Sequence, residues 1–463
     1  MKFDRTTPPP PGAVRAFEFP AVRRSRLSGG MTVLHAEHGG LPLVTVRAVV
    51  DAGAGTELPG EEGLAWLTAH ALEGGTERRG GEELAWELER LGTQLETLAS
   101  WDGTHVGLSV HRDRLPAALD FLAEIVRTPA FPAREVERLR GEQLAEIMRR
   151  RTEPRGLADD AAIHFIYADE AAYSRTLLGR ADRVAAFDAG QAAAFHRRRF
   201  SPGTGGLVVV GDVDAATALR EAERTFGDWS GDGDAAAAPT ALPRTDSTTV
   251  YLVDRPGAVQ SELRIGHVGV PRHHEDYHAL LVLNSIVGGA FTSRLNMSLR
   301  ERHGFTYGVR SSFGFRRAAG PFVIQTAVAS DVTARAVEET LREVRGIVDD
   351  GVTHDEVAAA RDFLAGTFAL GVQTTDQLAG RVADIHTFGL GTDYFETHRE
   401  RLGAVSRDDV VRAARSHLHL DRLAIVAVGN ADAIADGLEA LDAGPVVRTT
   451  FGQDAPPAGT EAA

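Results

Sequence analysis

The stretch that decides how this chain folds runs from Gly288 to Gly314 and reads GGAFTSRLNMSLRERHGFTYGVRSSFG. Leu295 and Leu299 stand one helical turn apart in it, and this spacing predicts a helix over Phe291–Leu299 with one apolar face. Gly304 follows a charged turn and is the expected end of that helix, because glycine readily takes the left-handed conformation that stops a helix.

A strand is predicted next, over Phe305–Phe315, where aromatic and β-branched residues are bounded by glycine. Arg300 then lies in the last helical turn and Tyr307 near the start of the strand, so both polar tips can face one spot. Arginine and tyrosine donors can bind peptide carbonyls or a developing oxyanion. The alternative is that Arg300 pairs with a surface carboxylate while Tyr307 is a half-buried strand residue.

The segment LRERHGFTYGV, Leu299–Val309, resembles the second-domain signature Leu-Arg-Glu-Lys-x-Gly-Leu-x-Tyr of the insulinase-type (M16) zinc peptidases. The preceding VGGAFTSRL is similar to the Leu-Gly-Gly-Gly-x-x-Ser-Arg-Leu of the small bacterial members. The resemblance implies that Arg300 and Tyr307 are substrate-binding residues, which hold a peptide near a zinc site in a different domain.

Length and composition set the class of protein. A chain of 463 residues is expected to form two to four domains, and its 43% of hydrophobic residues suffices for globular cores. The net charge of -15 disfavours nucleic acid as a partner, and no apolar run is long enough to span a membrane. The absence of cysteine excludes disulfides and thiolate metal sites. The N-terminus lacks an apolar signal core, so we expect a cytoplasmic protein.

The first half alternates short strands with longer helices. Strands are predicted over Arg26–His35 and Leu43–Ala52, paired across a turn at Gly39-Gly40. Further along the chain we expect helices over Gly63–Gly74, Gly81–Leu91, Leu115–Val126, Glu135–Arg151 and Asp188–Arg199, and strands over Leu95–Ala99, Thr104–Val110 and Leu207–Val210.

The second half repeats the first. The segments Phe187–Asp214 and Val405–Asp432 each open a helix at an N-cap candidate and end a strand at glycine. The interval between the N-caps Asp188 and Ser406 equals the interval between the strand-ending glycines Gly211 and Gly429. A repeat this long indicates two homologous domains.

The repeat sets the expected domain boundaries. We predict an extended lead over residues 1–20, a first domain over 21–229, a linker over 230–249, a second domain over 250–443 and a mobile tail over 444–463. The predicted linker is small, polar and proline-bearing in composition.

The resemblance extends over about residues 20–443 and implies an α+β fold. Each of the two M16-type domains is then a mixed, largely antiparallel sheet packed with helices. The segment LETLASWDGTHVGLSV resembles the family's edge-strand region, where a peptide can add as an extra strand.

The zinc motif of active family members is degenerate here. The family pattern carries His-x-x-Glu-His on a helix, which places two ligands and a general base on one face. It aligns with GLAWLTAHALEGGT, where Trp66 takes the first ligand position, Ala69 that of the base and His70 that of the second ligand. The family's third-ligand position falls on Glu146, in a later helix. His70 and Glu146 are then relics of a metal site, the alternative for His70 being a core or interface histidine.

Other candidate sites are weaker. His274 and His278 stand one helical turn apart at a helix start, with His273 beside them, and we expect all three to be solvated. Gly288-Gly289 lacks the lysine and the glycine spacing of a nucleotide-binding loop, so close packing is the better interpretation.

Loss of the zinc motif alongside a retained Arg300 and Tyr307 favours a non-catalytic subunit of a heterodimeric M16 peptidase. The chain itself has no catalytic residue and no cofactor in this hypothesis. A homologous partner with an intact His-x-x-Glu-His is expected to carry the zinc, and unfolded peptides are the expected substrates. Two alternatives are a structural subunit without a proteolytic role and a stand-alone peptide-binding homodimer.

Overall fold

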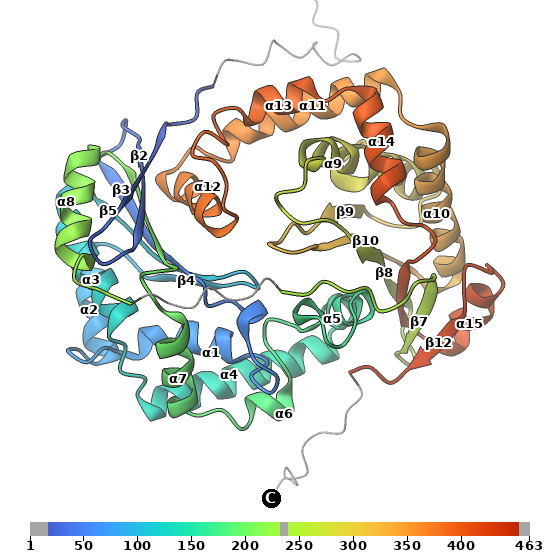
Figure 1. Ribbon diagram of the computed structural model, residues 1–463. Coiled ribbons are helices and arrows are strands. Elements are labelled where there is room, and N and C mark those ends of the chain that lie inside the picture. The colour runs from blue at the N-terminus through green and yellow to red at the C-terminus, as the bar shows by residue number, and fades with distance from the viewer. Residues whose placement is uncertain (1–16, 232–238, 453–463) are drawn as a thin grey trace, which may run out of the picture.

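The computed structural model describes residues 17–231 and 239–452, which form two domains side by side (Figure 1). In the first domain the strands are β1 (Val22–Arg26), β2 (Thr32–Glu37), β3 (Leu43–Val50), β4 (Glu96–Ala99), β5 (Thr104–His111) and β6 (Gly206–Gly211). The helices are α1 (Leu64–Ala71), α2 (Gly81–Leu91), α3 (Leu115–Arg127), α4 (Ala133–Thr152), α5 (Pro154–Ile166), α6 (Ala181–Val184), α7 (Ala189–Arg199) and α8 (Ala215–Phe226).

The second domain has the strands β7 (Thr249–Asp254), β8 (Gln260–Val268), β9 (Val309–Phe313), β10 (Pro321–Ala329), β11 (Ala424–Gly429) and β12 (Val446–Thr449). Its helices are α9 (Tyr277–Asn284), α10 (Thr333–Asp350), α11 (His354–Leu370), α12 (Thr375–Thr387), α13 (His398–Ala404), α14 (Arg407–His417) and α15 (Ala431–Glu439). Two π-helical turns, Ser285–Gly289 and Asn296–Arg302, follow α9.

The two sheets confirm the duplication. Their strand orders are β1-β2-β6-β3-β5-β4 and β12-β7-β11-β8-β10-β9, so the last five positions correspond one to one. In each sheet the strands of the last four positions pair antiparallel, and a parallel pair (β2 with β6, β7 with β11) comes directly before them. The first strands differ, because β1 is antiparallel to β2 and β12 is parallel to β7. The predicted caps are also present, since Asp188 and Ser406 each form a capping box at the start of α7 and α14.

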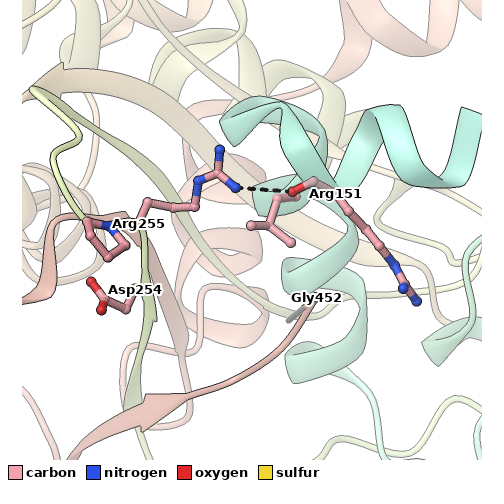
Figure 2. A pocket seen from close by; sticks show the side chains of 6 residues that line it. Arg151, Asp254, Arg255 and Gly452 are labelled. Carbon is pink, nitrogen blue, oxygen red and sulfur yellow. Dashed lines mark hydrogen bonds between the residues drawn. The ribbon is translucent and has the colours of Figure 1, made fainter. Parts of the chain in front are cut away.

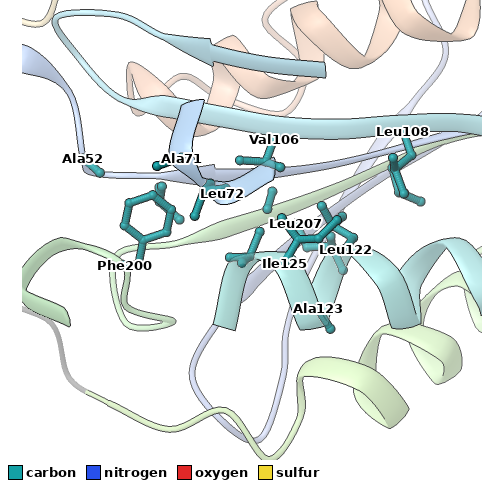
Figure 3. Close-up of a cluster of buried hydrophobic side chains, with 14 of the residues drawn as sticks. Ala52, Ala71, Leu72, Val106, Leu108, Leu122, Ala123, Ile125, Phe200 and Leu207 are labelled. Carbon is teal, nitrogen blue, oxygen red and sulfur yellow. The ribbon is translucent and has the colours of Figure 1, made fainter. Parts of the chain in front are cut away.

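Each sheet buries one face under helices of its own domain. In the first domain, Val106, Leu108 and Leu207 of the sheet pack against Leu122 and Ile125 of α3 (Figure 3). The second domain covers the corresponding face of its sheet with α9, α10, α14 and α15. Along β9 buried residues alternate with exposed ones, and along β10 with partly buried ones, as in strands that bury one face.

The opposite face of each sheet is covered by a helix from the other domain. Helix α12 of the second domain packs against β3 and β6, with Leu378 and Val382 buried against Val49 and Val208. Helix α5 of the first domain packs against β8 and β11, and Phe165 near its end stacks on Tyr251 with ring centroids 4.0 Å apart. Figure 1 shows both helices between the two sheets. Neither sheet is therefore covered on both faces by its own domain.

In each domain, an arginine of the sheet binds the helix that the other domain supplies. The two arginines occupy equivalent positions in the repeat. Arg47 of β3 donates to Asp376 at the start of α12 at 2.5 Å. Arg264 of β8, which is 3% exposed, donates to Asp159 of α5 at 2.7 Å. Each domain thus pairs an arginine in its fourth sheet position with a carboxylate on the helix that its neighbour supplies.

Two more contacts join the domains. In the turn between β9 and β10, the guanidinium carbon of Arg316 lies 3.6 Å from the ring centroid of Trp101. The next residue, Arg317, donates to Asp51 at 2.5 Å. Arg255, after β7, donates to the carbonyl oxygen of Arg151 near the C-terminus of α4 (Figure 2). A cation at that end of a helix stabilises its unpaired carbonyl groups.

Several expectations differ from the structure. The single strand expected over Arg26–His35 is a hairpin, β1 and β2, that turns at Gly29-Gly30. The expected pairing of that strand with β3 is wrong, because β6 lies between β2 and β3. Part of the predicted tail forms β12, which pairs with β7. Most of the predicted lead, residues 1–16, and residues 453–463 lie outside the described part.

Candidate functional site

The segment that carries Arg300 packs unusually closely on β9. A Cβ atom on Gly288 would lie 2.8 Å from the backbone nitrogen of Ser311, which no side chain can occupy, so glycine is required there. This supports close packing as the role of the Gly-Gly pair. One π-helical turn contains this pair, and a second one follows it along the chain. The π-helix is rare in proteins overall, and where it occurs it often lies at a functional site.

The structure changes the expected positions of the two signature residues. The helix begins at Arg294 rather than at Phe291, and Arg300 lies in its π-helical part. Gly304 ends this helix as predicted, with φ +64° and its N–H bonded to the Arg300 carbonyl at 3.1 Å. Strand β9 begins only at Val309, so Tyr307 lies in a loop.

The side chains of Arg300 and Tyr307 are both accessible. Tyr307 is 98% exposed, so the alternative of a half-buried strand residue is wrong. The Arg300 guanidinium lies over the ring of Phe291 at 4.3 Å, and its Nε is 3.4 Å from Glu301. Stacking on Phe291 holds the flat guanidinium in place and leaves its N–H edge for a ligand.

A buried asparagine that the sequence analysis missed connects these two residues. Asn296 lies one turn before Arg300, and its amide bonds both the N–H (3.1 Å) and the carbonyl (2.9 Å) of Val309, just after Tyr307. It also donates to the Ala290 carbonyl at 3.2 Å. The only signal in the sequence was an asparagine beside Leu295 on the predicted helix.

Arg300 and Tyr307 line one cavity of about 600 Å³, called here the Arg/Tyr cavity. Its wall comes from the two glycines, the loop before β9, the strands β8, β9 and β10, and Arg155 of α5. The two residues that the sequence analysis paired therefore line the same cavity, although the elements on which they lie differ from those predicted. Because Arg155 belongs to the first domain, this part of the wall is added only when the two domains are docked.

The stretch that the resemblance aligns with the zinc motif lies on α1, within the helix that the sequence predicts. The Trp66 ring stacks on the His70 ring at 3.8 Å, and His70 Nδ1 bonds the Trp66 carbonyl at 2.8 Å. Burial lowers the pKa of His70, which keeps the imidazole neutral. Ala69 is fully buried in the core and has no group that could move a proton.

These residues do not fit a catalytic zinc ion. Both carboxylate oxygens of Glu146 accept from Arg149 at 2.7 Å, which lowers the Glu146 pKa. The cavity beside His70 is bordered on α4 by Glu135, Arg138 and Leu139. An indole in place of one histidine leaves at most two of the three ligand positions of the motif occupied by a possible ligand, and a catalytic zinc needs three protein ligands.

The three histidines near α9 are not all solvated, which corrects that expectation. His278 Nε2 lies 3.1 Å from His398 Nδ1, and burial lowers the His278 pKa to about 4. His274 lies with Asp276 and His417, the metal-compatible group found among the described residues. His417 already bonds one Asp276 oxygen and Arg412 the other, at 2.9 and 3.0 Å, so these groups satisfy one another without an ion.

The chain matches two family models in the order that the resemblance implies. Residues 33–180 match the insulinase family, peptidase family M16, and residues 186–364 match the peptidase M16 inactive domain. The chain belongs to the insulinase-type M16 family. Its α+β architecture with two homologous M16 domains is thereby confirmed.

The similarity to relatives extends over most of this chain. An uncharacterized zinc protease of Streptomyces coelicolor is 25% identical over 402 residues, covering 86% of this chain and 87% of the relative. One of Mycobacterium tuberculosis is 26% identical over 364 residues, covering 78% and 83%. The crystal structure of a peptidase M16 inactive domain from Pseudomonas fluorescens superposes with a TM-score of 0.83 at 25% identity, covering 88% of this chain and 98% of that one. A protease from Helicobacter pylori shares the fold at the same TM-score of 0.83, with 18% identity, covering 89% and 100%.

The M16 edge strand is present as β4, at the end of the first sheet and hydrogen-bonded to β5. Among the described residues, no helix is both long and apolar enough to cross a bilayer.

Proposed function

We propose that this chain is the non-catalytic subunit of a two-chain M16 peptidase. It contributes Arg300 and Tyr307 to a zinc site on a homologous partner chain and closes the chamber that holds an unfolded peptide. The observation that carries this proposal is the contrast between the two signatures. The ligand and base positions on α1 hold Trp66 and Ala69, while Arg300 and Tyr307 stand accessible in one cavity.

The two side chains suit a role in binding peptide. The Arg300 fork can hold a peptide carbonyl in a fixed orientation, and the Tyr307 hydroxyl can donate to the oxygen on which charge develops. The bound zinc of the partner supplies an activated water and polarises the scissile carbonyl. The side chains of this subunit then orient the peptide against that centre.

The experiment combines the purified chain with a homologue that carries His-x-x-Glu-His and measures cleavage of a quenched fluorescent peptide. Activity is expected from the mixture and from neither chain alone. Arg300→Ala is expected to lower kcat/KM about 100-fold without affecting assembly, as loss of one oxyanion donor does elsewhere. Tyr307→Phe, which keeps the ring, is expected to lower kcat more than it raises KM.

The matched control is Arg302→Ala. Arg302 lies on the same turn, is exposed and pairs with Glu343 at 3.4 Å rather than lining the Arg/Tyr cavity, so full activity is expected. Unchanged turnover in Arg300→Ala would defeat the role assigned to Arg300. A stable complex that cleaves no peptide would instead indicate a structural subunit, and a homodimer that binds peptide unaided would indicate a stand-alone binding protein.

A further inference from the structure

The Arg/Tyr cavity has a strongly asymmetric charge. Four arginines line it, namely Arg155, Arg264, Arg300 and Arg310, against the single carboxylate of Glu262. This is the reverse of the whole chain, in which acidic residues outnumber basic ones by 65 to 50. An excess of cations in one hollow of an acidic protein raises the local concentration of anionic ligands.

One of these arginines is already neutralised. Arg264 donates to Glu262 at 2.9 Å and to Asp159 at 2.7 Å, and it is almost fully buried. The carboxylate of the cavity wall is therefore used within the protein. It cannot balance the charges of the other arginines.

The remaining arginines are available to a ligand. Within the described parts of the chain, no carboxylate lies within ion-pair distance of Arg155 or Arg310, and both residues are exposed. Arg300 has one ion-pair contact, with Glu301 at 3.4 Å from Nε, and no hydrogen bond from its two terminal nitrogens is found among the same residues.

The three arginines reach the cavity from different elements. Arg155 comes from the first turn of α5 in the first domain, Arg310 from β9 and Arg300 from the π-helix. Gln260 and Gln325 add neutral amide groups to the wall. A ligand that enters thus meets cations on several sides and uncharged hydrogen-bonding groups between them.

From this arrangement we infer that the cavity selects peptide segments that carry a carboxylate, with Arg155 and Arg310 as the residues that set the preference. The inference rests on the proposed peptide-binding role of Arg300 and Tyr307 and adds a substrate class to it. The carboxylate can be an Asp or Glu side chain or the C-terminus of the peptide, since arginine binds all of these through paired charge-assisted hydrogen bonds.

Peptide binding to the purified full chain, without any partner, tests this. Three short unstructured peptides of equal length with a zwitterionic rhodamine label are compared by fluorescence anisotropy. One has central glutamates and an amidated C-terminus, one has glutamines in their place, and one has glutamines with a free C-terminal carboxylate. At least one carboxylate peptide is expected to bind about tenfold more tightly than the neutral one at low salt, and the difference is expected to shrink at about 0.5 M NaCl.

The double variant Arg155→Gln/Arg310→Gln is expected to lose this preference. The matched control is Arg197→Gln/Arg345→Gln, which removes one exposed arginine from each domain outside the cavity wall and is expected to keep it. Equal or unmeasurable binding of all three peptides would overturn the inference, as would a preference that survives in the cavity variant. Cleavage by the mixed chains is measured separately, so the proposed subunit role can fail or succeed independently.

Discussion

At the scale of single residues, Trp66 and Asn296 have opposite consequences. Trp66, which the family resemblance aligns with a ligand position, stacks on His70, so the two side chains pack against each other on one face of α1. Asn296 holds the turn of Arg300 to the loop of Tyr307 by bonding the backbone of Val309 through both its N–H and its carbonyl. In the proposed function, the first residue takes the place of a metal ligand, and the second holds together the two residues that bind peptide.

Asn296→Ala should separate the two signature residues. It leaves a buried N–H and carbonyl of Val309 unpaired, so we expect the free energy of unfolding to fall by about 1–3 kcal/mol in urea titrations. Turnover with the partner chain should fall as well. Asn296→Asp keeps the acceptor for the Val309 N–H but loses the donor. Its free energy of unfolding should lie between those of the unmodified chain and Asn296→Ala. Asn430→Ala is the control, because Asn430 forms no side-chain cap on α15. Equal stability of Asn296→Ala and the unmodified chain would contradict this role.

At the scale of elements, the exchanged helices α5 and α12 determine the geometry of the molecule. Helix α5 was not predicted from the sequence. Its polar start, PRGLADD, gives little sign of a buried face, and its apolar side packs on a sheet formed by the second half of the chain. The first turn of this helix is also what brings Arg155 to the Arg/Tyr cavity.

Breaking the two equivalent arginine pairs should loosen this exchange. Arg264→Leu leaves Glu262 and Asp159 without their shared cation and is expected to destabilise the chain by up to about 3 kcal/mol. Arg47→Leu should have a smaller effect, because both of its partners, Asp376 and Glu96, are substantially exposed.

A double-mutant cycle with Asp159→Leu measures the coupling at the more buried pair. Arg264→Leu combined with Asp159→Leu should cost less stability than the two single changes added together, because neither charge is then left without its partner. Urea midpoints of the single and double variants give the comparison. An additive double variant would show that the pair is not coupled.

At the scale of the whole molecule, each domain covers one face of the other domain's sheet. Each sheet would expose an apolar face if its neighbour's helix were removed, since α12 covers the first sheet and α5 the second. Exposed faces of that kind promote aggregation.

The separate halves, cut within residues 232–238, are expected to aggregate when expressed alone and to assemble when expressed together. Co-purification and circular dichroism measure this outcome, and the intact chain should unfold in a single transition. A half that shows its own cooperative thermal transition would contradict the interdependence of the domains.

Buried histidines should make the molecule acid-sensitive. Burial lowers the pKa of His267 to about 3, and the pKa values of His105, His196 and His398 are lowered in the same way. Such a group is neutral in both states well above its ordinary pKa, while below that value the unfolded chain binds protons that the native chain does not. Stability is therefore lost as the pH falls from about 6.5, by up to about 1.4 kcal/mol per pH unit for each histidine.

The comparison of His267→Gln with the control His273→Gln isolates this effect, because His273 is exposed. Between pH 7 and pH 5 the urea midpoint of His267→Gln should fall less than that of the unmodified chain, and that of the control should fall equally. Burial raises the pKa of Glu57 to about 8, so the pH dependence of stability that Glu57 contributes is opposite to that of the histidines. Glu57 is present in all three proteins and does not affect the comparison. Identical pH profiles would show that His267 does not contribute.

The sequence by itself determined the family, the duplication and most elements that depend on neighbours close along the chain. Capping residues at Asp188 and Ser406, the stop at Gly304 and the helical spacing of α1 to α4 are local signals, and the structure confirms them. The assignment of Trp66 and Ala69 to the ligand and base positions of the motif also rests only on an alignment of residue types, and it stays a prediction.

Only the tertiary structure decided which strands pair, which helix covers which sheet and what surrounds Arg300. Strand β6 inserts between β2 and β3 from the far end of its domain, and Arg155 reaches a cavity whose other residues begin at Gln260. Such contacts depend on the burial of apolar faces that are complete only after both domains dock. Local sequence patterns do not predict these long-range contacts. The contacts are stabilised by the burial of two apolar surfaces against each other, and the chain brings those surfaces together only in the folded state.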